Sequence, residues 1–113
     1  MSMNSLLEMT LFVRDVEVSA TFYSAVGASL FTVDEPGWPR HYDGFIGESA
    51  IQLFPAGEQP VSRVQLGFRV VDIGQTAASL SELGFAVDLA LPRRLRTIDP
   101  DGNRVHLSQL RGL

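Results

Sequence analysis

The sequence predicts a single α+β domain made of two tandem copies of a βαβββ unit, with each helix packed on one face of a sheet. Three observations lead to this fold class: an internal repeat, strands that alternate polar and apolar residues, and helices with one apolar stripe. The repeat is a constant, ungapped shift that aligns similar residues of the two halves: Met9 with Leu66, Leu11 with Phe68, Val13 with Val70, Asp15 with Asp72, Val16 with Ile73, Ala20 with Ala77, Val26 with Leu83 and Gly27 with Gly84.

The repeat divides the chain of 113 residues into two modules within one domain. We expect module one at about residues 5–55 and module two at about residues 63–110. The segment between them, about residues 55–62, contains two prolines and a glycine and is therefore the expected linker. Because each module is short, we expect neither to be stable alone.

Each module begins with a strand, at about residues 8–13 and 65–70, in which apolar and polar residues alternate. An aspartate follows each strand at the expected helix N-cap, and a glycine ends each helix because glycine adopts the left-handed conformation without strain. Between them apolar residues recur at helical spacing. The expected apolar stripes are Val16, Ala20, Tyr23 and Val26 in the first helix and Ile73, Ala77, Leu80 and Leu83 in the second.

Three short strands are expected after each helix, because alternating segments are separated by turn residues. Their expected ranges are 29–33, 38–45 and 50–54 in module one, and 85–89, 95–98 and 104–108 in module two. The turn at residues 99–103, Asp-Pro-Asp-Gly-Asn, forces a tight reversal, since aspartate and asparagine bond their own backbone, proline fixes φ and glycine supplies a positive φ.

Composition excludes several classes of function. Nine basic residues against 13 acidic ones give a net charge of -4, which argues against a nucleic-acid-binding protein. Arg93, Arg94 and Arg96 form the one basic cluster and indicate either a strand edge or a local anion site. The chain has no cysteine and no long apolar run, so disulfides, thiolate chemistry and a membrane span are not expected. We expect a cytoplasmic protein.

With these features in place, the chain resembles the vicinal oxygen chelate superfamily of glyoxalases, bleomycin-resistance proteins and extradiol dioxygenases. The opening strand and helix, residues 8–23, and the closing hairpin around the turn at residues 99–103 are similar to those of the family. The resemblance implies that the two modules form an open, cup-shaped mixed sheet with helices on the outer side. It also implies that the cup holds a small ligand, often with a divalent metal, and that the protein is a homodimer.

Residue by residue, the resemblance carries the metal-ligand positions of the family onto Glu8, Gln52, Gln65 and His106. Alternation independently places these four side chains on the strand face away from the helices. Amide, carboxylate and imidazole groups suit Mn²⁺, Fe²⁺, Ni²⁺ or Zn²⁺. The set nevertheless matches neither glyoxalases nor dioxygenases. Two alternatives stay open: the four line a ligand cavity or bond one another, or His106 acts as a metal-free base oriented by Glu8.

Trp38, Tyr42 and Phe54, together with His41, indicate either an aromatic wall of the cup or ordinary packing. His41 is expected at the surface. Arg69 has the strand parity of Gln65, so it pairs with an anionic ligand, lies solvated on the rim or forms a salt bridge. Two functions follow from the resemblance: metal-dependent lyase, isomerase or dioxygenase chemistry, or sequestration of a small molecule or antibiotic without catalysis.

Overall fold

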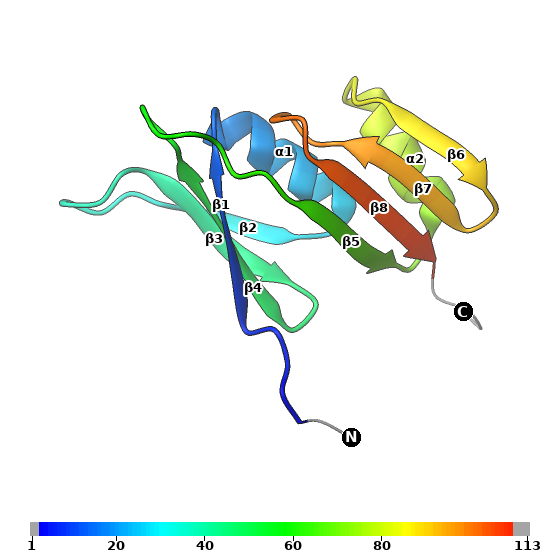
Figure 1. The fold of residues 1–113 in the computed structure, drawn as a ribbon, viewed down its shortest axis with the longest axis horizontal. Coiled ribbons are helices and arrows are strands. Elements are labelled where there is room, and N and C mark those ends of the chain that lie inside the picture. The colour runs from blue at the N-terminus through cyan, green and yellow to red at the C-terminus, as the bar shows by residue number, and fades with distance from the viewer. Residues whose placement is uncertain (1–2, 110–113) are drawn as a thin grey trace.

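The computed structural model describes residues 3–109, which fold into the predicted βαβββ order twice (Figure 1). Module one contains β1 (Glu8–Val13), α1 (Val16–Val26), β2 (Ser29–Val33), β3 (His41–Ile46) and β4 (Ser49–Pro55). Module two contains β5 (Gln65–Val70), α2 (Ile73–Glu82), β6 (Val87–Leu91), β7 (Arg94–Ile98) and β8 (Arg104–Gln109). Neither helix in this described part is long and apolar enough to cross a membrane.

The strands form two mixed sheets of four, in the order β1-β4-β3-β2 and β5-β8-β7-β6. In each sheet the first and last strands of the module pair in parallel, and the remaining neighbours are antiparallel. Both helices lie behind the sheets in Figure 1, so the other face of each sheet is bare. The molecule measures 46 × 39 × 22 Å, and its short axis spans one helix layer and one sheet layer. The predicted open arrangement, with helices on one side, is confirmed.

The core lies between the helices and the strand residues that point toward them. Leu11, Ile51, Leu95 and Leu107 are each at most 1% exposed, as alternation within their strands predicts. The helices supply the other side of the core. Their buried residues include the predicted Ala20, Tyr23, Val26, Ile73, Ala77 and Leu80, and also Phe22, which contacts Tyr23 and Phe85 edge to face.

The helix ends agree with the sequence, with one exception. Asp15 accepts hydrogen bonds from two backbone N–H groups of the first turn of α1, and Asp72 accepts one from Gln75. Gly27 and Gly84 both have positive φ, at 124° and 88°. The prediction that Leu83 belongs to the buried stripe is wrong, because α2 ends at Glu82 and leaves Leu83 49% exposed as its C-cap.

The turn at residues 99–103 does more than reverse the chain. Asp99 is 3% exposed, and its carboxylate accepts four hydrogen bonds: from the backbone N–H groups of Asp101 and Asn103, from the Asn103 amide, and from the Tyr23 hydroxyl at 2.6 Å. Asn103 in turn accepts a bond from the backbone N–H of Val64, next to the linker. Since Tyr23 belongs to α1, this turn ties module two to module one.

The buried Tyr23 hydroxyl makes the stability of the fold depend on pH. Burial, and then the hydrogen bond and negative charge of Asp99, raise the pKa of the Tyr23 phenol above its ordinary value. The folded protein therefore keeps the phenol proton where the unfolded chain loses it. Its contribution to stability is complete below about pH 10 and is lost as the pH rises further.

We therefore expect the free energy of unfolding to fall above about pH 10, by up to about 1.4 kcal/mol per pH unit. The chain has no lysine and no cysteine to titrate in this range. Urea unfolding at several pH values from 9 to 12 measures the slope, and the difference between wild type and Tyr23→Phe isolates Tyr23. Equal slopes in the two proteins would contradict the expectation.

Candidate functional site

The face of the two sheets opposite the helices, here called the open face, is the candidate site. Alternation assigns to it every second residue of each strand, and the paired registers extend it across both sheets. Its two halves differ in chemistry. The aromatic half, on β1 to β4, comprises Phe12, Phe31, His41, Phe45 and Phe54; the arginine half, on β5, β7 and β8, comprises Arg69, Arg94, Arg96, Arg104 and His106.

The four predicted metal ligands all occupy open-face strand positions but lie in different surroundings. Glu8 and Gln65 are exposed, whereas Gln52 and His106 are half-buried. The Oε1 atom of Gln52 accepts a hydrogen bond from the Thr10 hydroxyl at 2.9 Å. The two pockets that His106 lines contain none of the other three residues. Glu8 and His106 belong to different sheets and share no hydrogen bond or ion pair within residues 3–109.

His41 lies on the open face, a position that the sequence analysis offered as one alternative when it grouped His41 with the aromatic wall. The prediction that it is a surface residue is wrong, because it is 5% exposed and stacks on Phe54 with 4.0 Å between ring centroids. Its Nδ1 atom lies 2.9 Å from the Pro39 carbonyl oxygen, which only accepts, so Nδ1 is the donor of this hydrogen bond. Its Nε2 atom lies 3.2 Å from Oδ1 of Asp43. Alternation was the sequence signal for this position, because His41, Asp43 and Phe45 occupy every second position of β3 and therefore share one face.

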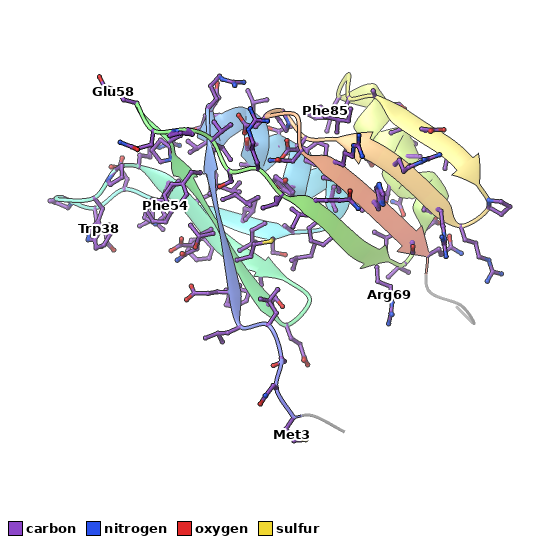
Figure 2. All side chains as sticks on the ribbon, viewed as in Figure 1. Met3, Trp38, Phe54, Glu58, Arg69 and Phe85 are labelled. Carbon is purple, nitrogen blue, oxygen red and sulfur yellow. The ribbon has the colours of Figure 1, made fainter. Side chains whose placement is uncertain are left out.

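The predicted aromatic wall needs two corrections. Tyr42 follows His41 and therefore points to the helix side, where its hydroxyl donates to Glu17 of α1 and Arg40 lies 5.6 Å from its ring centre. Trp38 precedes β3, which begins at His41, and lies 62% exposed in the connection from β2 (Figure 2). Phe54 is on the open face as expected. Arg69 is also there, at the end of β5, and lines a pocket of about 320 Å³ between the modules.

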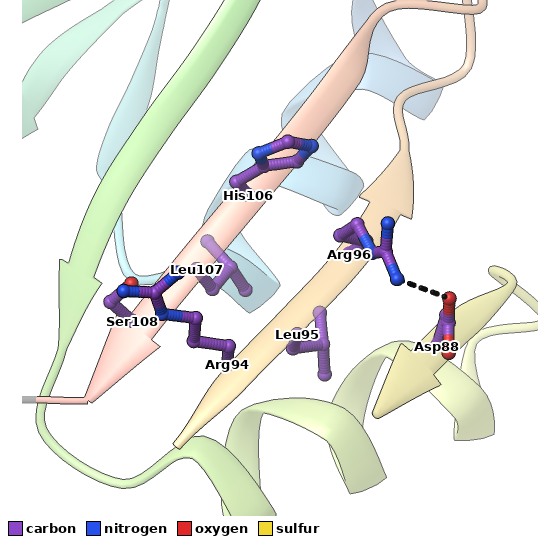
Figure 3. A pocket seen from close by; sticks show the side chains of 7 residues that line it. All are labelled: Asp88, Arg94, Leu95, Arg96, His106, Leu107 and Ser108. Carbon is purple, nitrogen blue, oxygen red and sulfur yellow. Dashed lines mark ion pairs between the residues drawn. The ribbon is translucent and has the colours of Figure 1, made fainter. Parts of the chain in front are cut away.

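Two adjoining pockets lie over the arginine half. One, of about 240 Å³, is lined by Asp88, Arg94, Leu95, Arg96, His106, Leu107 and Ser108 (Figure 3). The other, of about 460 Å³, shares Asp88, Arg96 and His106 with it and adds Arg104 and Ile98. Arg96 forms an ion pair with Asp88 at 3.4 Å, whereas Arg94 and Arg104 have no ion pair among the described residues.

Comparison with protein families decides the family. The sequence model of the Glyoxalase/Bleomycin resistance protein/Dioxygenase superfamily matches residues 5–107, which is nearly the whole chain. The chain belongs to this superfamily. No curated protein matches the sequence significantly.

Solved structures of the superfamily share the fold along the whole chain. TnmS3, an antibiotic binding protein from Streptomyces sp. CB03234, is 25% identical with a TM-score of 0.70, over 96% of this chain and 98% of that one. A lactoylglutathione lyase from Agrobacterium tumefaciens is 19% identical with a TM-score of 0.66, over 96% and 97%. The fosfomycin resistance protein FosX from Listeria monocytogenes is 15% identical with a TM-score of 0.73, over 96% and 93%.

Members of the superfamily commonly use divalent metals, but the residues at the corresponding positions here do not fit one. Among residues 3–109, no three His, Asp or Glu side chains are grouped so that they could hold a metal ion. The Gln52 amide oxygen is already an acceptor for Thr10. His106 lies beside Arg96, its register partner on β7, and shares a pocket with Arg94, so the positive charges of these two arginines repel a cation.

Proposed function

We propose that the protein binds a small molecule on the open face without a metal, as a sequestering protein. The observation that carries the proposal is the position of His106, the one imidazole among the four family metal positions, in a pocket with Arg94 and Arg96. A site for a divalent cation gathers carboxylates or neutral imidazoles, whereas this pocket gathers cations. The likeness to TnmS3, an antibiotic binding protein, adds support.

Metal-dependent lyase, isomerase or dioxygenase chemistry is the weaker alternative. It needs a cation that accepts oxygen atoms of the substrate, and therefore at least three protein ligands around one point. Proton transfer by His106 with Glu8 is also disfavoured, since an orienting acid has to contact the base and these two residues lie on separate sheets. The pocket supplies hydrogen-bond donors and shape, which are sufficient for binding.

Titration with metal tests the proposal. We expect chelator-treated protein to show no stoichiometric binding of Mn²⁺, Fe²⁺, Ni²⁺ or Zn²⁺ by calorimetry and less than about 1 °C of thermal stabilisation, because a ligand stabilises only the state to which it binds. His106→Ala is the control for adventitious binding. One equivalent of tightly bound metal in wild type that is lost in His106→Ala would contradict the proposal.

We also propose that the protein is a homodimer in which a second copy covers the aromatic half. Phe31 on β2 and Phe45 on β3 lie on neighbouring strands and are each 55% exposed, and Phe12 on β1, at the other edge of the sheet, is 47% exposed. The aromatic half therefore presents apolar side chains to water on three of its four strands. No other element within residues 3–109 lies over this face (Figure 1). A second copy of the chain has the same aromatic half, so the two aromatic halves are equal in extent and can cover each other.

Light scattering tests the dimer. We expect wild type to have twice the 12.4 kDa mass of one chain and Phe45→Glu to have the mass of one chain, since a charge buried in an apolar interface is costly. Val71→Glu is the control, because Val71 is also an exposed apolar residue, at 68%, but lies in the loop after β5. A wild-type protein that is monomeric at micromolar concentration would refute the dimer.

A further inference from the structure

The arginine half concentrates positive charge on a protein that is negative as a whole. The chain has nine basic residues and a net charge of -4, yet Arg69, Arg94, Arg96 and Arg104 share this one half. The one carboxylate in its two pockets belongs to Asp88. Most of the negative charge of the chain therefore lies elsewhere, and this half differs in sign from its surroundings.

Strand register brings these cations close to one another. Arg96 is paired with His106 and Arg94 with Ser108 across β7 and β8, while Arg104 is two residues before His106 on the same face. Arg94 and Arg96 stand two residues apart on one face of β7, and Arg104 is the diagonal neighbour of Arg96, so the charges of the three arginines repel one another. Asp88 at 3.4 Å offsets part of the charge of Arg96 only. A bound anion would relieve the repulsion that remains.

The two pockets give such an anion a place and a set of donors. In the smaller pocket the guanidinium groups of Arg94 and Arg96, the Ser108 hydroxyl and the His106 ring can all donate hydrogen bonds (Figure 3). Planar guanidinium groups bind carboxylate and phosphoryl oxygens through paired bonds. The larger pocket continues from it along Val87 and Ile98, which suit an apolar portion of a ligand.

We propose that the ligand is a small organic anion whose carboxylate or phosphoryl group is held by Arg94 and Arg96 beside His106, with Arg104 adding charge at the larger pocket. This inference rests on the proposed binding function and names the chemical class of the ligand. Carboxylates and phosphates both present negatively charged oxygen atoms to the arginines, so the ligand carries one or the other of these two groups. At His106, which occupies a metal position of the family, the ligand is thus held by hydrogen-bond donors and by the positive charge of the neighbouring arginines.

A set of four probes of similar size tests the inference: benzoate, phenyl phosphate, the neutral benzamide and the cationic benzamidine. We expect NMR titration of chelator-treated protein to give at least about tenfold tighter binding of one or both anions than of benzamide, and no binding of benzamidine. The tighter anion identifies the source. Shifted amide signals are expected along β7 and β8.

Arg94→Gln and Arg96→Gln are each expected to weaken anion binding at least about tenfold. Arg93→Gln is the matched control: it removes the same charge from the neighbouring residue, which lines neither pocket. Thermal unfolding verifies that the variants are folded. Equal affinity for benzamide and the anions, equal weakening by Arg93→Gln, or no saturable binding of either anion overturns the inference. A metal requirement for anion binding would instead overturn the metal-free function and leave the ligand class standing.

Discussion

Replacing Asp99 with alanine is expected to lower the free energy of unfolding by at least about 3 kcal/mol. The Asp99 carboxylate accepts four hydrogen bonds at a position that is 3% exposed. Without it, the Tyr23 hydroxyl and the Asn103 amide lose a buried partner, and each unsatisfied polar group costs about 1–3 kcal/mol. Urea unfolding followed by circular dichroism measures the loss.

The control for this loss is a double-mutant cycle with Tyr23→Phe, which removes one donor and keeps the ring in the core. Tyr23→Phe alone is expected to cost about 1–2 kcal/mol, and the two changes together less than their sum, because they share one hydrogen bond. Additive losses, or an Asp99→Ala variant within about 1 kcal/mol of wild type, would show that the turn does not tie the modules together.

Gly44→Ala is expected to unfold the protein or to cost more than about 3 kcal/mol. Gly44 is buried in β3, opposite Leu30 of β2, and a Cβ atom at this position would overlap the backbone carbonyl of Ser29. Backbone of a paired strand cannot move aside as a flexible side chain can, so β2 has to separate from β3. Expression level, thermal unfolding and circular dichroism measure the effect.

Gly67→Ala is the matched control, because Gly67 also lies within a strand. A Cβ atom there meets only the His106 carbonyl, at 3.9 Å, which is an ordinary contact. Alanine in place of glycine reduces the freedom of the unfolded chain, so the stability of Gly67→Ala is expected to equal or slightly exceed that of wild type. If the two glycine variants were equally stable, the close approach of β2 and β3 would be refuted.

Much of the fold could be predicted because its signals are periodic. Residues such as Val105 and Leu107 alternate with polar neighbours, and both are buried in the core. The predictions failed around β3. The expected strand at 38–45 included Trp38, whereas β3 begins at His41, and the predicted aromatic wall grouped His41 with its neighbour Tyr42 although alternation points the two to opposite faces.

The site was less predictable than the fold, because it depends on which strands are neighbours. The sequence placed His106 and Gln52 on one face but could not show that they lie in separate sheets. It grouped Arg94 and Arg96 as a strand edge or an anion site without choosing between them. The proposal of an anion site rests on the register that pairs Arg96 with His106, which joins residues on different strands.

The open face is proposed to bind its ligand without a metal. The most direct test measures the dissociation constant of benzoate or phenyl phosphate, whichever binds more tightly, by calorimetry in the presence of EDTA and again with one equivalent of Mn²⁺, Ni²⁺ or Zn²⁺. We predict that the dissociation constants agree within about twofold, since the arginines supply the charge. Binding that is absent in EDTA and restored by one of these metals would contradict the account.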